Sequence, residues 1–193
     1  MKFAFVLVLL AALLGIGQID SPNQNKWEVS PAAVAASARE YPTVNVVPLH
    51  REKNWGGGSC VHASLVMLFR WQGRYQMAAH WRNTYIGGEY ANRCHGRLEK
   101  EGVRWAATHN DVKFLDWACR TRRGCAVTVM GGAHMVCLVH FDETRAGILD
   151  NNNIGKIKWM TRDAFIKEWK GASGWAVTPC YTPPAPLPWV APK

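Results

Sequence analysis

The sequence predicts an α+β domain in which an antiparallel sheet packs against a helical half. Apolar residues recur with a helical period up to about residue 120, and short β-branched apolar runs replace that pattern after residue 125. Helices first and strands second are typical of the α+β class. A length of 193 residues and an apolar share of 48 % suit one domain with a real core and exclude a disordered chain.

The helical half is expected to begin at Cys60. Apolar side chains follow a 3.6-residue period over residues 60–71, and the preceding Ser59 can cap this helix. Either Asn110 or Asp111 can cap a later helix whose buried face includes Leu115. The four expected helices therefore cover residues 60–71, 74–85, 89–100 and the segment that begins at 112.

The strands are expected in the second half of the chain, where β-branched and apolar residues form short runs. The turn at Glu143 and Thr144 joins two of these runs as a hairpin. A short helix over residues 161–169, capped by Thr161 with Asp163 in its first turn, precedes the last strand. The expected strands cover residues 126–130, 134–141, 147–149, 156–160 and 174–178.

The N-terminus has the pattern of a secretory signal peptide. A basic start and about 15 apolar residues fill residues 1–17, and Gly15 and Gly17 permit cleavage before Gln18. An uncleaved anchor is the alternative, although a membrane span needs about 20 apolar residues. We therefore expect a secreted protein, extracellular or periplasmic, with no stable membrane anchor.

The remaining divisions follow from composition. Residues 18–45 are polar and contain prolines, so we expect an N-terminal arm or linker there. Residues 46–180 form the folded domain. Residues 181–193 are proline-rich, which predicts an extended tail that either docks through Trp189 or stays free.

The chain is basic, with a formal net charge of +9. A basic face can attract nucleic acid, anionic cell wall or anionic lipid. We favour an ordinary solvated surface, because the basic residues are spread along the chain and no nucleic-acid motif is visible. No Cys or His cluster has the spacing of a zinc site, so we expect neither a metal nor a cofactor. We expect a monomer.

The segment Asn-Trp-Gly-Gly-Gly-Ser-Cys at residues 54–60 carries the first chemical signal. A cysteine in the first turn of a helix lies at the positive end of the helix dipole, which favours the nucleophilic thiolate. The glycine run lets a substrate backbone approach closely. The backbone N–H of Cys60 can donate to a developing oxyanion, and the side chain of Asn54 is the obvious second donor.

A thiolate needs a base, and position selects His134 among seven histidines. It opens an apolar strand after a glycine turn. If this strand and the next form a hairpin, Asp150 returns beside His134 and can orient the imidazole. His140 lies at the far end of the same strand.

This order of residues resembles that of papain-like cysteine peptidases. A cysteine at a helix start, a histidine that opens a later strand and an acid or amide sixteen residues beyond are found here as Cys60, His134 and Asp150. The layout is most similar to the bacteriocin-processing, double-glycine-leader peptidases, in which a Gln stands where this chain has Asn54. A shift of one residue would make Asn151 the orienter.

The resemblance implies a papain-like fold that covers roughly residues 54–178. It implies Cys60 as nucleophile, His134 as general base and acid, Asp150 as orienter and Asn54 as oxyanion donor, acting on a peptide or protein substrate. The residues that flank the reacting groups would line the substrate path: Trp55, Gly57, Gly58, Ser59, Gly132 and Ala133.

The leading hypothesis is a secreted thiol hydrolase that cleaves a peptide or isopeptide bond. A transglutaminase-like acyl transferase and a cell-wall amidase use the same chemistry. The rival from another class is a disulfide-stabilised binding module without chemistry, since a secreted cysteine is commonly bridged. Cys119 and Cys125 bracket a helix end and a strand start, so they could form one bridge. A second bridge would join Cys137 and Cys180 if their strands are neighbours in the sheet, and Cys94 would then be left over.

Overall fold

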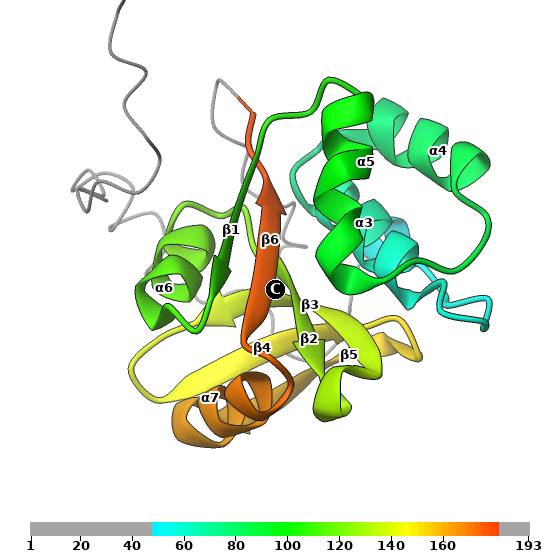
Figure 1. The fold of residues 1–193 in the computed structure, drawn as a ribbon. Helices are drawn as coiled ribbons and strands as arrows, with labels where there is room; N and C mark the ends of the chain where they lie inside the picture. Colours follow the sequence, from blue (N-terminus) through cyan, green and yellow to red (C-terminus); the bar gives the residue numbers. More distant parts are fainter. Residues whose placement is uncertain (1–47, 182–193) are drawn as a thin grey trace, which may run out of the picture.

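A computed structural model describes residues 48–181, which form helices and a six-stranded antiparallel sheet (Figure 1). The class is therefore α+β, as predicted. The expectations of a signal peptide over residues 1–17, of an arm over residues 18–45 and of a proline-rich tail beyond Tyr181 lie outside the described residues. Within residues 48–181, no helix is both long enough and apolar enough to cross a membrane.

The first helical layer contains the expected helix that begins at the candidate nucleophile. Helix α3 spans Cys60–Trp71 and α4 spans Tyr75–Thr84, which confirms both predictions to within one residue. The third helix begins later than the expected Glu89. Tyr90 is extended, a 3-10 turn η2 follows at Ala91–Arg93, and α5 spans Cys94–Lys100.

The sheet has the strand order β1-β6-β2-β3-β4-β5. Strands β2 to β6 lie where the sequence predicts them, with ends that differ by up to three residues. The bounds are β2 Cys125–Val129, β3 His134–Phe141, β4 Arg145–Asp150, β5 Asn153–Thr161 and β6 Trp175–Pro179. Strand β1, Trp105–His109, is not predicted. It is a half-buried edge strand that pairs only with the distant β6.

Two further helices cover the opposite face of the sheet. Helix α6 spans Val112–Arg120 and is capped by Asp111, whose Oδ1 accepts from the Lys113 N–H at 2.9 Å. Helix α7 spans Arg162–Gly171 and is capped by Thr161. The expectation of a sheet packed against one helical half is therefore incomplete, because helices cover both faces.

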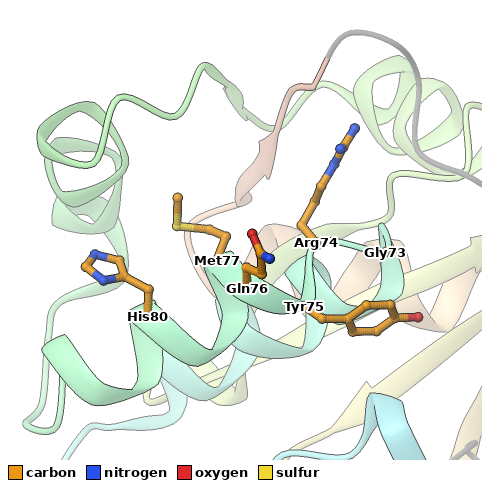
Figure 2. Close-up of a pocket in the computed structure, with 6 residues that line it drawn as sticks. All are labelled: Gly73, Arg74, Tyr75, Gln76, Met77 and His80. Carbon is orange, nitrogen blue, oxygen red and sulfur yellow. The ribbon is translucent and has the colours of Figure 1, made fainter.

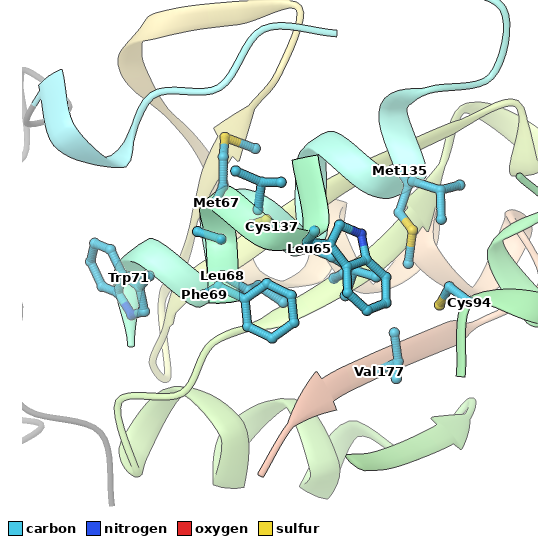
Figure 3. Close-up of a cluster of buried hydrophobic side chains, with 14 of the residues drawn as sticks. Leu65, Met67, Leu68, Phe69, Trp71, Cys94, Met135, Cys137 and Val177 are labelled. Carbon is cyan, nitrogen blue, oxygen red and sulfur yellow. The ribbon is translucent and has the colours of Figure 1, made fainter. Parts of the chain in front are cut away.

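The core consists of two clusters, one on each face of the sheet. Figure 3 shows the first, in which Leu65, Leu68 and Phe69 of α3 pack over Cys137 and Val177 of the sheet. The second joins α6 and α7 to the other face through fully buried side chains such as Phe165 and Trp169. Burial of this apolar surface fixes the position of α3 on the sheet.

Polar contacts between α3 and β3 add a precise register to this packing. The Ser64 hydroxyl donates to the Met135 carbonyl at 2.9 Å, and the Cys137 thiol donates to the Ser64 carbonyl at 3.0 Å. The first turn of α3 consequently lies beside the start of β3. Strand β4 pairs with β3 as the predicted hairpin and ends at Asp150, so its end lies in the same region.

The expected disulfides are absent. All six cysteines lie among residues 48–181, and each is a free thiol. The pairing of Cys137 with Cys180 was wrong in its premise, because β2 separates β3 from β6 and Cys180 follows the end of β6. The Cys119 thiol contacts the Leu138 carbonyl at 3.8 Å and does not bridge to Cys125.

Candidate active site

The loop before α3 owes its path to three consecutive glycines. Gly56, Gly57 and Gly58 have φ values of 85°, 56° and 83°, a left-handed conformation that side chains disfavour. The Ser59 N–H donates to the Gly56 carbonyl at 3.0 Å and closes the turn. Cys60 then opens the helix, as the sequence predicts.

Ser59 does not cap α3 with its side chain, contrary to expectation. It is buried, and its hydroxyl accepts from the Trp55 N–H at 2.9 Å and donates to Asn54 Oδ1 at 2.6 Å. The Gly56 N–H also donates to Asn54 Oδ1, at 2.9 Å. A backbone N–H can only donate, so these bonds fix which end of the Asn54 amide is the oxygen.

Cys60 Sγ lies 3.9 Å from the Gly58 carbonyl oxygen. The thiol also interacts with the imidazole of His134, and each of the two residues shifts the pKa of the other. Burial opposes ionisation of the thiol. The hydrogen bond from His134, the backbone of Met135 and the positive charge of His134 together outweigh burial, so the pKa of Cys60 lies below its usual value. The backbone of Val61 in the first turn of α3 acts in the same direction.

His134 is held by Asp150, whose Oδ1 lies 3.0 Å from Nε2 of the imidazole. The hydrogen bonds to Asp150 and to Cys60 raise the pKa of His134 to about 9 against the opposing effect of burial. The hydrogen bond from His134 in turn lowers the pKa of Asp150. Because Nε2 faces Asp150, Nδ1 is the nitrogen that remains for the thiol.

Asn151, the alternative orienter, faces a different direction. It is fully buried, and its Nδ2 lies 3.3 Å from the Cys60 carbonyl, 3.0 Å from Ser64 Oγ and 2.8 Å from the Met135 carbonyl. The backbone carbonyl of Asn151 accepts a hydrogen bond from the backbone N–H of Asn54 at 2.9 Å. Asn151 thus joins the start of α3, the start of β3 and the loop at Asn54, while Asp150 contacts the imidazole.

Of the six expected substrate-binding residues, five are exposed and one is buried. Gly57, Gly58, Gly132 and Ala133 are exposed on the two segments that lead into Cys60 and His134. Trp55 is 58 % exposed, and the guanidinium of Arg82 lies 3.2 Å from the centre of its ring. Ser59 is 1 % exposed, so its contribution is to the loop rather than to an open surface.

The other histidines occupy separate environments. His62 is buried against Trp81 and Tyr85, and burial lowers its pKa to about 4. His80 on α4 has an acidic partner, Glu101, whose Oε2 lies 2.6 Å from Nε2 of the imidazole. His140 lies 2.6 Å from Oδ2 of Asp142 in the turn that follows β3, at the far end of the strand from His134.

A pocket of about 580 Å³ opens at the start of α4 (Figure 2). It is lined by Gly73, Arg74, Tyr75, Gln76, Met77 and His80, none of which belongs to the Cys60, His134 and Asp150 cluster. Among the described residues, no group of three or more His, Cys, Asp or Glu side chains has an arrangement suited to a metal ion.

Sequence reasoning missed two features of this region. Asn152 accepts from Asn54 Nδ2 through Oδ1 at 3.2 Å, and its Nδ2 lies 3.4 Å from His134 Nε2. Gly88 lies against the backbone of Gly57 and Gly58. The sequence signals for these features are the run of three asparagines after Asp150 and the Gly87-Gly88 pair. Neither signal shows which distant residue the segment contacts.

No family model and no curated protein matches the chain. Among solved structures, the chain is similar to a double glycine motif protease from an AMS/PCAT transporter, solved in complex with a leader peptide. The identity is 17 % and the TM-score is 0.48, over 74 % of this chain and 96 % of that chain.

Proposed function

We propose that the protein is an exported thiol hydrolase of papain-like fold, a cysteine peptidase that cleaves a peptide or isopeptide bond. One observation carries the proposal: Cys60 opens a helix beside His134, which lowers the pKa of the thiol, and Nε2 of His134 lies 3.0 Å from Oδ1 of Asp150. Nucleophile, base and orienter in this relation are the arrangement that thiol acyl transfer requires. Export is proposed from residues 1–17 alone.

In the proposed reaction the Cys60 thiolate attacks the substrate carbonyl carbon. A C–S bond forms and the carbonyl electrons move to oxygen, where the Cys60 N–H and Asn54 Nδ2 donate hydrogen bonds. The intermediate collapses, the C–N bond breaks, and the imidazolium of His134 gives its proton to the leaving amine. Neutral His134 then takes a proton from water, whose oxygen attacks the thioester carbon. The C–S bond breaks, the carboxylic acid leaves, and the Cys60 thiolate and the His134 imidazolium are restored.

The electrostatics support an ion pair as the resting state. The pKa of Cys60 is lowered and the pKa of His134 is raised to about 9. The thiolate and the imidazolium therefore coexist over a pH range. The range begins at the lowered pKa of Cys60, below that of an ordinary thiol, and ends at about pH 9, where His134 loses its proton. A thiol of this kind reacts at neutral pH, where an ordinary cysteine is mostly protonated.

The proposal is tested by alkylation of the native, unreduced protein with iodoacetamide at about pH 6. We expect fast labelling of Cys60, located by mass spectrometry, while the other five thiols react slowly. Burial raises the pKa of Cys94 and Cys180, which makes them internal references. A Cys60 that reacts no faster than free cysteine, or that is found in a disulfide, would contradict the proposal.

A substitution at Asp150 tests the role of the orienter. In Asp150→Asn the hydrogen bond that does most to raise the pKa of His134 is weakened, so the imidazolium is lost below pH 9. Where the imidazolium is lost, its positive charge and hydrogen bond no longer lower the pKa of Cys60, so that pKa rises. We expect the pH range of the ion pair to narrow from both sides and labelling at pH 6 to slow. Stopped-flow alkylation across pH measures both limits, and the exposed Asp163→Asn is the matched control.

The rival binding module would use Cys60 as part of a disulfide scaffold. All six cysteines are free thiols, and His134 lowers the pKa of the Cys60 thiol. These observations favour the thiol hydrolase over the binding module. An acyl transferase would use the same residues but pass the acyl group to an amine instead of water. A cell-wall amidase would use the same residues on an amide bond of the cell wall.

A further inference from the structure

The candidate oxyanion donor Asn54 does not stand alone. Its Oδ1 accepts hydrogen bonds from the Ser59 hydroxyl and from the Gly56 N–H, at 2.6 Å and 2.9 Å. These two bonds hold the oxygen end of the amide against its own loop. The nitrogen end must then point away from that loop, and it meets Oδ1 of Asn152 at 3.2 Å.

Asn152 belongs to the turn between β4 and β5, beside the Asp150 that holds His134. Its backbone N–H donates to Asp150 Oδ1 at 2.9 Å. Asn152 therefore links two parts of the site: its side chain contacts the loop before α3, and its backbone contacts the carboxylate that holds the imidazole. The residue is exposed, so this link is not explained by packing.

The contact of Asn152 Nδ2 with His134 Nε2 is the weaker of the two side-chain contacts. It is 3.4 Å long, whereas Asp150 Oδ1 lies 3.0 Å from the same nitrogen. When the Nε2 hydrogen is donated to Asp150, Nε2 has no lone pair left to accept from Asn152. The bond that the Asn152 side chain makes under those conditions is the one to Asn54.

We infer that Asn152 is a positioning residue that fixes the Asn54 amide for the oxyanion of the reaction proposed above, on which this inference rests. An amide nitrogen carries two hydrogens. One donates to Asn152 Oδ1 and locks rotation of the amide, and the other remains for the substrate oxygen. A preset donor costs no reorganisation when the oxyanion forms.

Two probes of Cys60 separate this role from a general structural one. Iodoacetamide reacts with the thiolate by displacement of iodide and forms no oxyanion. In 4-nitrophenyl acetate the thiolate attacks the carbonyl carbon, a tetrahedral oxyanion forms, and collapse breaks the C–O bond and releases 4-nitrophenolate. Both probes report on the thiolate, but only acetylation reports on the oxyanion donors.

We expect Asn152→Ala to slow acetylation of Cys60 by roughly three- to tenfold, the factor that one neutral hydrogen bond contributes. The rate of alkylation at pH 6 should stay within twofold of the wild-type rate, because the Asp150 contacts remain. The neighbouring exposed Asn153→Ala is the matched control, and we expect it to change neither rate.

A double-mutant cycle identifies the partner. If Asn152 acts through Asn54, adding Asn152→Ala to Asn54→Ala causes no further loss of acetylation. The inference is overturned if Asn152→Ala leaves acetylation unchanged, if it slows both reactions equally, or if the two losses multiply. The proposed function fails separately, when wild-type Cys60 reacts no faster than free cysteine with either probe.

Discussion

Replacing His134 with alanine is expected to slow the alkylation of Cys60 at pH 6 by about 100-fold or more. Burial is the largest single influence on the Cys60 thiol and opposes its ionisation, and the hydrogen bond and charge of His134 do most to overcome it. Without the imidazole, burial remains. The pKa of Cys60 then moves above its present value, and only a small fraction of thiolate survives at pH 6.

The pH dependence distinguishes this cause from a folding defect. The wild-type rate should be nearly level across the range in which thiolate and imidazolium coexist, up to about pH 9. The rate for His134→Ala should climb continuously with pH, so the two rates converge under alkaline conditions. An unfolded or distorted protein would instead expose several thiols and lose selectivity for Cys60.

His80→Ala is a suitable control for this experiment. His80 also contacts a carboxylate, Glu101, but it lies on α4 outside the cluster around Cys60. We expect the wild-type rate for this variant. If His134→Ala were labelled as fast as the wild type, the start of α3 alone would activate the thiol, and His134 would have no part in producing the nucleophile.

The helix at Cys60 and the strand at His134 could be predicted closely because their signals are local. Apolar spacing marks α3 over all twelve of its residues, and the glycine turn before His134 marks the start of β3. The position of Asp150 followed from one further assumption, the β3–β4 hairpin, which the pairing of Cys137 with Leu149 confirms.

The features that were missed depend on distant partners. Strand β1 contains two alanines and has little β character of its own; it is a strand because β6 pairs with it from about seventy residues away. The premise behind the second disulfide failed for a similar reason, since strand order decides that β2 lies between β3 and β6. Neither fact is encoded in a short stretch of sequence.

The asparagines of the site show the same limit at the scale of single atoms. The sequence singled out Asn54 as a donor and Asn151 as an alternative orienter. It could not show that Ser59 holds the oxygen of Asn54, or that Asn151 is buried against α3 and β3. Three adjacent asparagines look alike in the sequence, yet Asn151 is buried while Asn152 is exposed.

The Gly57 backbone should move in a Gly88→Ala variant, with large effects on Cys60. A Cβ at Gly88 would overlap the carbonyl oxygen of Gly57 and lie 3.3 Å from Cα of Gly58. These are backbone atoms, so no side-chain rotation can make room. Either the segment around Gly88 or the loop that leads into Cys60 must shift.

Shifting either segment breaks contacts that hold the loop. The Glu89 N–H donates to the Gly58 carbonyl at 3.4 Å, so the two segments are joined beside Cys60. We expect Gly88→Ala to reduce the free energy of unfolding by about 1–3 kcal/mol, the usual cost of overpacking. Because the loop sets the start of α3, we also expect slower alkylation and slower acetylation of Cys60.

Gly87→Ala provides a matched control one residue away. A Cβ at Gly87 meets no atom within 4 Å, and neither Gly87 nor Gly88 has the left-handed φ that would penalise alanine in itself. The two variants therefore differ in the room available for the added methyl group and not in the backbone conformation that alanine must adopt. Thermal unfolding and the two labelling rates should be near wild type for Gly87→Ala and reduced for Gly88→Ala.

Equal behaviour of the two variants would mean that the Gly88 segment does not hold the loop before Cys60 in solution. A loss of stability with unchanged labelling would mean that the Gly88 segment gives way while the loop keeps its place. The expected pattern, in which stability and both rates fall together, requires that the segment after α4 and the loop before α3 act as one support. That support would then set the position of Cys60 at the start of α3, while the sheet sets the position of His134.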